Sequence, residues 1–532
     1  MKLPPRYFPF LSACGVTVGC FALLLATSSS IPIVWDEGDT IFRAEQILRV
    51  AEESQGQDAP SFWQALRSPA NWPYTLVREG HPPLSGILVA IGLRLAPDGL
   101  DPLTRARLAP MLLFSVAVGA MFFRLQREYG VWAVSVMAVA ALLTMPRVFA
   151  HAHFATLDGP VTACWLLAWA LFAHACRDWR LIGGFGVALG LTFSAKFTGW
   201  LAPLPFLAWA ALYRDLRALR ALAVGVPIAV AVFVALNPPL WDAPVEGLRT
   251  FFDLNLNRAS QHGLNITTQF FGRMHDLDHP LPWYNTLVWT AITISPVPML
   301  IGCIGLVASL RRWRTDRGAI LIVCQWATLV IVRALPFSPP HDAERLILPS
   351  FAFFAALIGV GIGRALYRDS LLLPEKIVAQ GWAKIAMAIA LVAPTVDSIM
   401  YFPHGLSFYN RLVGGLQGAS ALGMEPTYYW DALDRETLAW LREHTAGDEK
   451  IAFGAAPPKN LALLKRWGFL GRLPDDEGTF RWYVIQRRPS AWTAADRWLI
   501  DNERPAFQRT LSGVPLLDVY SFDQYQRAND AP

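Results

Sequence analysis

Long apolar runs recur along the sequence, and they constrain its fold more than any other feature. Each is roughly 17–25 residues long with few or no charges, which is the length that an α-helix needs to cross a bilayer. Eleven such runs lie at 9–32, 108–123, 131–149, 160–176, 181–195, 197–213, 219–236, 286–310, 319–335, 346–366 and 383–400. Since 54% of the 532 residues are hydrophobic and only 16% are charged, the chain carries too much apolar surface for a soluble protein. The sequence predicts a mainly α, polytopic protein of the inner (plasma) membrane.

A twelfth apolar piece, "HPPLSGILVAIGLRLA" at 81–96, is shorter and is interrupted by Pro82, Pro83 and Arg94. Lys and Arg concentrate in short cytoplasmic loops, so their positions decide how this piece is placed. The main clusters are Lys2/Arg6, Arg124/Arg127, Arg177/Arg180, Arg214/Arg217/Arg220, Arg311/Arg312/Arg314/Arg317 and Arg364/Arg368/Lys376. All six fall on one face if 81–96 does not cross. We therefore expect this piece to lie in the outer interface, with the N-terminus cytoplasmic and the C-terminus outside.

Two parts of the chain depart from the apolar pattern. Residues 237–285 are polar and aromatic-rich, and the stretch is too long for a simple connector. Residues 401–532 alternate strand-like pieces ("KIAFGA", "FRWYVIQ", "PLLDVYSF") with helical ones ("ALDRETLAWLREH", "NLALLKRWG", "TAADRWLIDN"). We expect a transmembrane domain of about 11 helices at 1–400, with outer loops 33–107 and 237–285. A small extracytoplasmic α/β domain follows at 401–532.

The first run has an alternative interpretation as a cleaved signal peptide, because Lys2 and Arg6 precede it and "TSSS" follows it. The stretch "LSAC" at 11–14 also resembles a lipoprotein cleavage box, although the apolar run continues well past Cys14. We favour a first membrane span. The net charge of +5 follows from the cytoplasmic Arg clusters and does not indicate a nucleic-acid partner.

Ionisable residues gather at the predicted outer boundary of the membrane, a position that is costly and usually functional. Asp36 and Glu37 directly follow the first run, and Asp158 precedes the fourth. The cations near the same boundary are His81, Lys196 and Arg345. A carboxylate can accept the proton of an attacking hydroxyl, and cations stabilise the charge on a leaving phosphate. This combination suits transfer of a group from a lipid-linked phosphate.

These residues lie in motifs that follow one another along the chain: Asp-Glu after the first run, "HPPL", "TLDGP", "AKFTG" and "ERLILP". Over roughly residues 1–400 the sequence resembles the GT-C glycosyltransferases of the protein O-mannosyltransferase and aminoarabinose transferase type. The resemblance implies a GT-C helix bundle, a polyprenyl-phosphate sugar donor and an active site on the extracytoplasmic face. It also implies a catalytic Asp that matches Asp36 and a second outer-loop acid that matches Asp158.

The remaining candidate residues are assigned by the same resemblance and by their charge. Lys196 stands where some members carry a basic residue, and Arg345 opens a span, so both are candidates to bind the donor phosphate. His81 stands where aminoarabinose transferases have Lys in "KPP", and imidazole is only partly charged near neutral pH. Glu37 is a second candidate for direct participation beside Asp36. We expect inversion at the sugar, with Asp36 as the base and a protein, lipid or glycan hydroxyl as the acceptor.

No cofactor is expected to be required. Six histidines near acidic residues nevertheless leave a divalent metal open, although none shows a recognised ligand spacing: His151, His153, His262, His275, His279 and His341. Residues 403–433 are aromatic and Gly-rich, and they are candidates to line the acceptor side.

Each site residue also has a structural interpretation. Asp36 can cap the helix that follows it, and Asp158 can cap the helix that begins at Pro160. Lys196 can snorkel from the end of a span, and Arg345 can be a charge anchor. Two other classes of protein stay open: a secondary transporter, whose charges would lie near the membrane midplane, and a non-enzymatic assembly or polysaccharide-binding protein.

Overall fold

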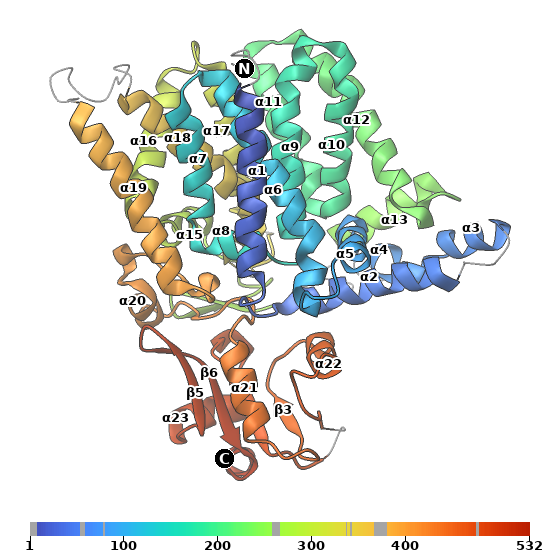
Figure 1. Ribbon diagram of the computed structural model, residues 1–532, viewed down its shortest axis with the longest axis vertical. Coiled ribbons are helices and arrows are strands. Elements are labelled where there is room, and N and C mark those ends of the chain that lie inside the picture. Colours follow the sequence, from blue (N-terminus) through green and yellow to red (C-terminus); the bar gives the residue numbers. More distant parts are fainter. Residues whose placement is uncertain are drawn as a thin grey trace.

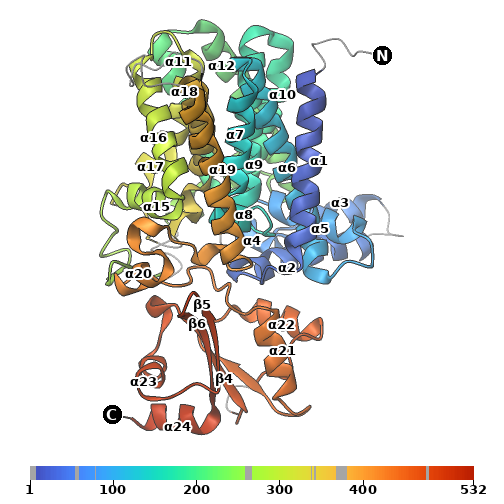
Figure 2. The same cartoon turned by 60° about the vertical axis from the view of Figure 1, so that its left-hand side comes forward.

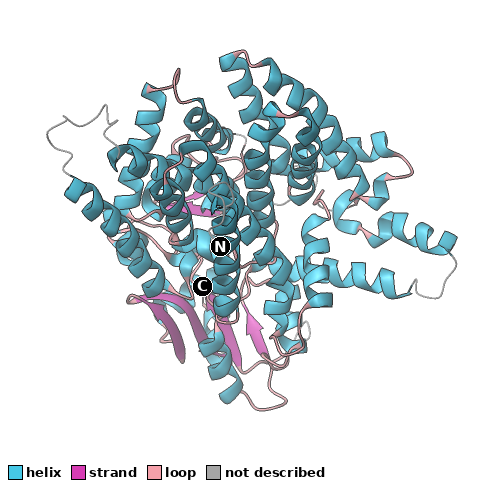
Figure 3. Ribbon diagram, turned by 45° about the horizontal axis from the view of Figure 1, so that its top comes forward, coloured by secondary structure: helices cyan, strands magenta, loops and turns pink. Residues whose placement is uncertain are grey.

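The computed structural model describes residues 8–53, 59–77, 80–257, 266–336, 338–340, 343–366, 380–474 and 478–531. It consists of a helix bundle with a small sheet-containing domain at one end, which we call the domain end of the bundle (Figure 1). The first described helix, α1 (Phe8–Ser28), begins at the opposite end (Figure 2). Helices dominate, and the strands form a short hairpin beside the bundle and the sheet of the C-terminal domain (Figure 3).

Every predicted span coincides with helical structure. The apolar helices are α1 (Phe8–Ser28), α6 (Pro102–Tyr129), α7 (Trp132–Leu143), α8 (Pro146–His151), α9 (Asp158–Arg177), α10 (Ile182–Ala195), α11 (Pro203–Tyr213), α12 (Leu216–Ala235), α15 (Asn285–Thr293), α16 (Pro296–Arg311), α17 (Arg317–Val332), α18 (Leu348–Leu366) and α19 (Gln380–Tyr401). Short 3-10 turns accompany them: η3 (Trp179–Leu181), η4 (Phe197–Leu201) and η6 (Ala343–Ile347). In the described ranges, 5 of the helices are long and apolar enough to cross a membrane by length and composition alone. The mainly helical fold is confirmed, and the number of crossings stays a prediction.

Two runs that we expected to be continuous helices are broken at prolines. The run at 131–149 divides where Pro146 begins α8, and the run at 286–310 divides where Pro296 begins α16. Proline has no backbone N–H and disfavours helical backbone before it, yet it fits the first turn of a new helix. Short helices α8 and α15 therefore form at the domain end of the bundle (Figure 1).

Helix α18 forms the centre of the bundle. The most apolar 18-residue window of 343–364 is 100% buried inside the protein, compared with 17% for α1. Glycines let α16 approach α18 backbone to backbone, since a Cβ on Gly305 would lie 2.1 Å from the Leu357 carbonyl oxygen. Small residues at helix contacts are typical of membrane bundles, where close van der Waals packing holds the helices together.

The first predicted outer loop lies across the domain end. It contains α2 (Trp35–Glu53), α3 (Ala59–Arg67), η2 (Pro69–Asn71), α4 (Pro73–Leu76) and α5 (Leu84–Leu95) (Figure 1). At 1.5 Å per residue the 12-residue α5 is only about 18 Å long, too short for a hydrocarbon core of about 30 Å. This length agrees with the prediction that 81–96 does not cross the membrane.

The second predicted outer loop meets the first. It contains η5 (Pro238–Leu240), α13 (Pro244–Leu256) and a hairpin of β1 (Thr268–Phe270) and β2 (Arg273–His275). Arg67 of α3 forms a salt bridge of 3.1 Å with Asp242, so the two loops lie on the same side of the bundle.

The C-terminal region contains a four-stranded sheet with strand order β3-β4-β6-β5. The strands are β3 (Ile451–Phe453), β4 (Trp482–Gln486), β5 (Phe507–Leu511) and β6 (Val514–Ser521), and the helices and turns are α21 (Arg435–Glu443), α22 (Pro458–Arg466), η9 (Pro489–Ala491), α23 (Ala494–Asn502) and α24 (Phe522–Asp530). All six strand-like and helical pieces expected from the sequence are present. Strand β5 and helix α24 were not predicted; β5 is an edge strand, and its half-exposed residues give little apolar signal.

Residues 402–434 connect α19 to this domain and pack against the bundle. They contain η7 (Gly405–Ser407), η8 (Arg411–Val413) and α20 (Gly415–Ala421). Asn410 donates through its side chain to the carbonyls of Ala291 and Ile294, each at 2.6 Å, at the end of α15. The boundary that we predicted at residue 400 stays a prediction, and this connecting segment contacts both parts.

We expect reporter fusions at Asp98, Asp242 and the C-terminus to report an extracytoplasmic location, and fusions near Arg127 and Arg314 to report a cytoplasmic one. The reason is the concentration of Lys and Arg in cytoplasmic loops. Paired reporters that are active on opposite sides of the membrane measure this directly. A cytoplasmic signal at Asp242 would contradict the orientation.

Candidate active site

Asp36 lies in the first turn of α2, where the helix dipole stabilises a negative charge. Arg345 of η6 donates through Nη1 to Asp36 Oδ2 at 2.5 Å, and the Tyr429 hydroxyl donates to the same oxygen at 2.8 Å. Burial by itself would raise the pKa of the Asp36 carboxyl. The Arg345 guanidinium, the Tyr429 hydroxyl and the Lys196 ammonium outweigh burial and hold that pKa below its usual value. Asp36 is therefore ionised near neutral pH.

Asp158 and Lys196 form a second ion pair beside the first. Asp158 begins α9, and Lys196 follows the last residue of α10. The Lys196 Nζ lies 2.5 Å from Asp158 Oδ1, and the Asp158 side chain is only 2% exposed. Arg345 Nε lies 3.8 Å from Asp158 Oδ2, so Arg345 stands between the two carboxylates. Four predicted site residues, Asp36, Asp158, Lys196 and Arg345, thus form one group, which we call the four-residue cluster.

The four-residue cluster is built at helix ends. Asp36 and Asp158 begin helices, Lys196 follows one, and Arg345 directly precedes α18. The starts of α2, α9 and α18 and the end of α10 lie toward the domain end of the bundle (Figure 1). Charges at one rim agree with the enzyme interpretation, whereas a transporter would place them near mid-depth.

Glu37 is placed differently from its neighbour Asp36. Its carboxylate forms a bidentate pair with Arg107 of α6, with both N···O distances at 2.7 Å and both side chains 0% exposed. The backbone amides of Ala155 and Val34 donate to the same carboxylate at 2.9 and 3.1 Å. With four donors around its two oxygens, this buried carboxylate is held in place by the protein itself.

The remaining N–H groups of Arg107 donate to backbone carbonyls at the end of α1. It donates to the carbonyl oxygens of Ser28, Ile31 and Pro32 at 3.0, 2.9 and 2.7 Å. Ser28 is the last residue of α1 and the other two residues follow it, at a helix end where carbonyls lack partners within the helix. The Arg107–Glu37 pair therefore joins α6 to the end of α1 and to the first turn of α2, the turn that also carries Asp36.

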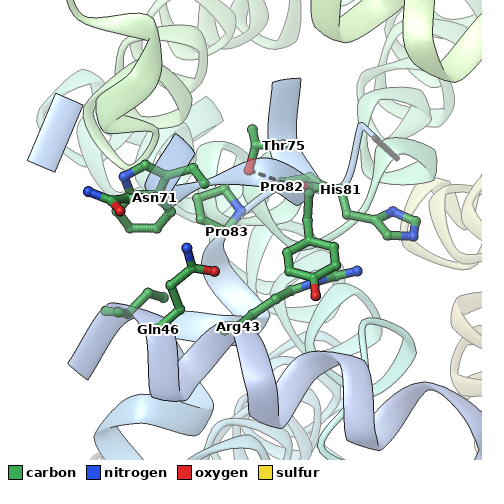
Figure 4. A pocket seen from close by; sticks show the side chains of 11 residues that line it. Arg43, Gln46, Asn71, Thr75, His81, Pro82 and Pro83 are labelled. Carbon is green, nitrogen blue, oxygen red and sulfur yellow. Dashed lines mark hydrogen bonds between the residues drawn. The ribbon is translucent and has the colours of Figure 1, made fainter. Parts of the chain in front are cut away.

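His81 lies in the first outer loop, and its carbonyl accepts a hydrogen bond from the Thr75 hydroxyl at 3.0 Å. It lines a cavity of about 20 Å³, which has room for one water molecule. Figure 4 shows the imidazole pointing away from Asn71 and Gln46, with Arg43 on the neighbouring helix. Of the described residues that line this cavity, none belongs to the four-residue cluster.

A buried ion pair behind Arg345 was not anticipated. Arg147 of α8 forms a salt bridge of 2.6 Å with Glu344, and both side chains are at most 2% exposed. His151 Nε2 lies 3.9 Å from the other Glu344 oxygen. Because Glu344 directly precedes Arg345, the pair fixes η6 beneath the cluster. An arginine inside an apolar run was the available sequence signal, since such a residue is costly and usually has a specific partner.

The histidines that left a metal site open are scattered. His153 contacts the Thr27 hydroxyl at 2.8 Å, and His279 lies 3.1 Å from Asp276 in the second outer loop. His262 and His341 lie outside the described residues. Within the described ranges, His, Cys, Asp and Glu side chains form no group of three or more that could hold an ion. The need for a metal stays open.

Comparison with known proteins identifies the fold. Residues 80–241 match the family model described as dolichyl-phosphate-mannose-protein mannosyltransferase. No curated protein matches the sequence significantly. The crystal structure of ArnT from Cupriavidus metallidurans in the apo state aligns with a TM-score of 0.53 and 14% identity, over 97% of this chain and 99% of that one. The chain has the fold of the GT-C glycosyltransferases.

A second ArnT structure from the same organism, bound to undecaprenyl phosphate, aligns with a TM-score of 0.50 and 12% identity. That alignment covers 96% of this chain and 98% of the other. The GT-C-type fold expected from the motifs is confirmed by the alignment with ArnT over nearly the whole chain, and residues 80–241 match the mannosyltransferase family model. Asp158, Lys196 and His81 lie inside the range that the family model matches, whereas Asp36 and Arg345 lie outside it.

Proposed function

We propose that this GT-C protein transfers a sugar from a polyprenyl-phosphate donor to an acceptor hydroxyl on the extracytoplasmic face of the plasma membrane. The observation that carries the proposal is the four-residue cluster, which places two carboxylates and two cations at one end of an apolar bundle. An ArnT of the same fold was crystallised with undecaprenyl phosphate. The bundle surface would hold the lipid tail while the cluster meets the phosphate and the sugar.

Asp36 acts as the base in this proposal. The acceptor oxygen attacks the anomeric carbon as its proton passes to the Asp36 carboxylate, and the bond from the anomeric carbon to the phosphate oxygen breaks. Attack opposite the phosphate inverts the configuration. The lowered pKa of Asp36 keeps it ionised and able to accept the proton near neutral pH.

Arg345 and Lys196 stabilise the polyprenyl phosphate as it leaves. Arg345 has five N–H donors in a planar fork, so it can hold Asp36 and a phosphate oxygen together. Lys196 has three donors, of which Asp158 Oδ1 takes one. Asp158 then orients Lys196, and His81 stays a candidate for a more distant phosphate contact.

We assign Glu37 a positioning role rather than direct participation. Its carboxylate is fully buried against Arg107 and two backbone amides, which leaves it little capacity to contact a substrate. The pair instead fixes the start of α2, and with it the backbone of Asp36.

The acceptor and the sugar can be identified by mass analysis of cell-envelope glycans, glycolipids and glycoproteins from cells with and without the gene. The proposal predicts loss of one sugar modification and accumulation of its lipid-linked donor. Unchanged envelope glycans, with loss of uptake or export of a small solute instead, would favour a transporter.

We expect Arg345→Ala and Lys196→Ala each to lower kcat/KM by about tenfold to a hundredfold, because a lost charge-assisted phosphate contact costs roughly 1.5–3 kcal/mol. Kinetics of the purified variants over a range of donor concentrations measure the loss. Arg67→Ala is the matched control, since Arg67 forms an exposed ion pair with Asp242 in the outer loops. Wild-type kinetics in both cluster variants would mean that these cations are only anchors.

A further inference from the structure

Tyr429 reaches the first turn of α2 from a distant part of the chain. It lies in the segment that connects α19 to the C-terminal sheet, and it is 2% exposed. Its carbonyl accepts a hydrogen bond from the Trp35 backbone amide at 3.2 Å, and its hydroxyl donates to Asp36 Oδ2. The Arg345 guanidinium carbon lies 4.4 Å from the centroid of its ring. One residue thus contacts the helix start, the proposed base and a phosphate-binding candidate.

The C-terminal domain holds the residues on both sides of Tyr429. Trp430 has a left-handed backbone (φ 57°), uncommon for a bulky residue, and its ring centroid lies 3.9 Å from that of Trp35. Arg488, which follows β4, places its guanidinium carbon 3.7 Å from the Trp430 ring centroid. Its Nη1 donates to the Tyr428 carbonyl at 2.5 Å. Arg488 is 1% exposed, so the strained turn is fixed by a buried side chain of the domain.

The C-terminal domain makes a second contact with the start of α2, through hydrogen bonds of Asn460. Asn460 of α22 donates to the Val34 carbonyl at 2.8 Å and accepts from the Gly38 amide at 2.9 Å. A Cβ on Gly38 would lie 2.2 Å from the Asn460 side-chain oxygen, so this contact requires glycine there. The helix turn that carries Asp36 is therefore held from two sides by residues beyond the bundle.

We propose that Tyr429 is a positioning residue for Asp36, and that the C-terminal domain, by fixing Tyr429, is a working part of the active site. This inference rests on the proposed function. The two hydrogen bonds to the Asp36 carboxylate both end on Oδ2. The carboxylate cannot rotate without breaking both bonds, and in this inference Oδ1 is the oxygen that takes the acceptor proton.

The charges around Asp36 predict how loss of Tyr429 would act. Arg345 from η6 and Lys196 after α10 favour the ionised carboxylate. Asp158 at the start of α9 contacts the same Arg345, and a second carboxylate so placed opposes ionisation through like-charge repulsion. A hydrogen bond from the neutral Tyr429 hydroxyl also favours the ionised form. Removing this bond therefore raises the pKa of Asp36, and the acidic limb of the rate profile moves to higher pH.

The test is Tyr429→Phe, which keeps the packed ring and removes only the hydroxyl. Purified protein is assayed from low to neutral pH with polyprenyl-phosphate sugars extracted from the source membranes, and release of polyprenyl phosphate is measured. We expect kcat to fall about tenfold, KM for the lipid to change little and the acidic limb to rise by about one pH unit. An unchanged acidic limb with unchanged kcat would overturn the inference.

Tyr428→Phe is the matched control. Tyr428 is the adjacent buried tyrosine, and its hydroxyl donates to the Gln269 carbonyl at 3.3 Å rather than to Asp36. The same shift of the acidic limb in Tyr428→Phe would mean that any disturbance of the loop produces it, and the inference would be wrong. If wild type releases polyprenyl phosphate and only the tyrosine predictions fail, the proposed function stands without this inference.

Arg488→Lys tests the role of the domain. Lysine keeps a positive charge near Glu425, which lies 3.8 Å from Arg488, but it lacks the planar group that stacks on Trp430. We expect a smaller shift of the acidic limb in the same direction. In the double variant with Tyr429→Phe, the shift should be no larger than in Tyr429→Phe alone. A wild-type profile in Arg488→Lys would contradict the part assigned to the domain.

Discussion

Replacing Asp36 with Asn should lower turnover with a polyprenyl-phosphate sugar by at least about 10²-fold, the scale of losing a general base. The amide has the same shape as the carboxylate, and it can still accept hydrogen bonds from Arg345 and Tyr429. It cannot take the acceptor proton. Expression and membrane insertion should be unaffected, so the loss belongs to the chemical step and appears in kcat.

Asp39→Asn is the matched control for this prediction. Asp39 lies one turn further along α2 and is paired with Lys459 of the C-terminal domain rather than with the cluster. We expect its turnover to stay close to that of wild type, and Glu37→Gln to cost less turnover than Asp36→Asn. Full activity in Asp36→Asn would exclude Asp36 as the base.

Arg107→Met should destabilise the protein by about 3–5 kcal/mol, because it leaves the Glu37 carboxylate buried without its charge partner. It also removes the donors to three carbonyls at the end of α1. Thermal unfolding of the purified protein in detergent, followed together with its yield in the membrane fraction, measures the effect. The loss should be similar with and without donor, since Arg107 does not contact the cluster in this account.

Two further variants isolate the buried pair. Arg105→Met removes a neighbouring arginine whose partner Asp98 is 98% exposed, and such surface pairs contribute only about 0–1 kcal/mol. The double variant Glu37→Gln/Arg107→Met removes both charges and should be less destabilised than the sum of the two single variants. A melting temperature in Arg107→Met equal to that in Arg105→Met would contradict the structural role of the pair.

The membrane part of the fold could be predicted because hydropathy is a local property of the sequence. Each apolar run became helix, although the sequence did not reveal the breaks before Pro146, Pro203 and Pro296. The four-residue cluster could be anticipated for a related reason. The charge pattern predicts that the ends of alternate runs lie on one side of the membrane, so acids and bases at those ends are expected near the same face.

The roles of Glu37, His81 and Tyr429 could not be read from the sequence, since each depends on a contact between distant segments. Asp36 and Glu37 are adjacent, yet about 100° of helical rotation separates them and directs one to Arg345 and the other to Arg107. His81 occupies the position expected from the "HPPL" motif, but it lines a cavity that none of the four cluster residues lines. Tyr429 is separated from Asp36 by 393 residues, so no local sequence pattern predicts their hydrogen bond.

The central claim is that this chain uses a lipid-linked rather than a nucleotide-linked sugar. The most direct measurement incubates the purified protein in detergent with polyprenyl-phosphate sugars extracted from the source membranes, or with a panel of nucleotide sugars, and quantifies free polyprenyl phosphate and glycosylated acceptor by mass spectrometry. We predict that polyprenyl phosphate is released with the lipid-linked sugars, that nucleotide sugars do not replace them, and that Asp36→Asn abolishes most of the release. Sugar transfer from a nucleotide sugar alone would contradict the account.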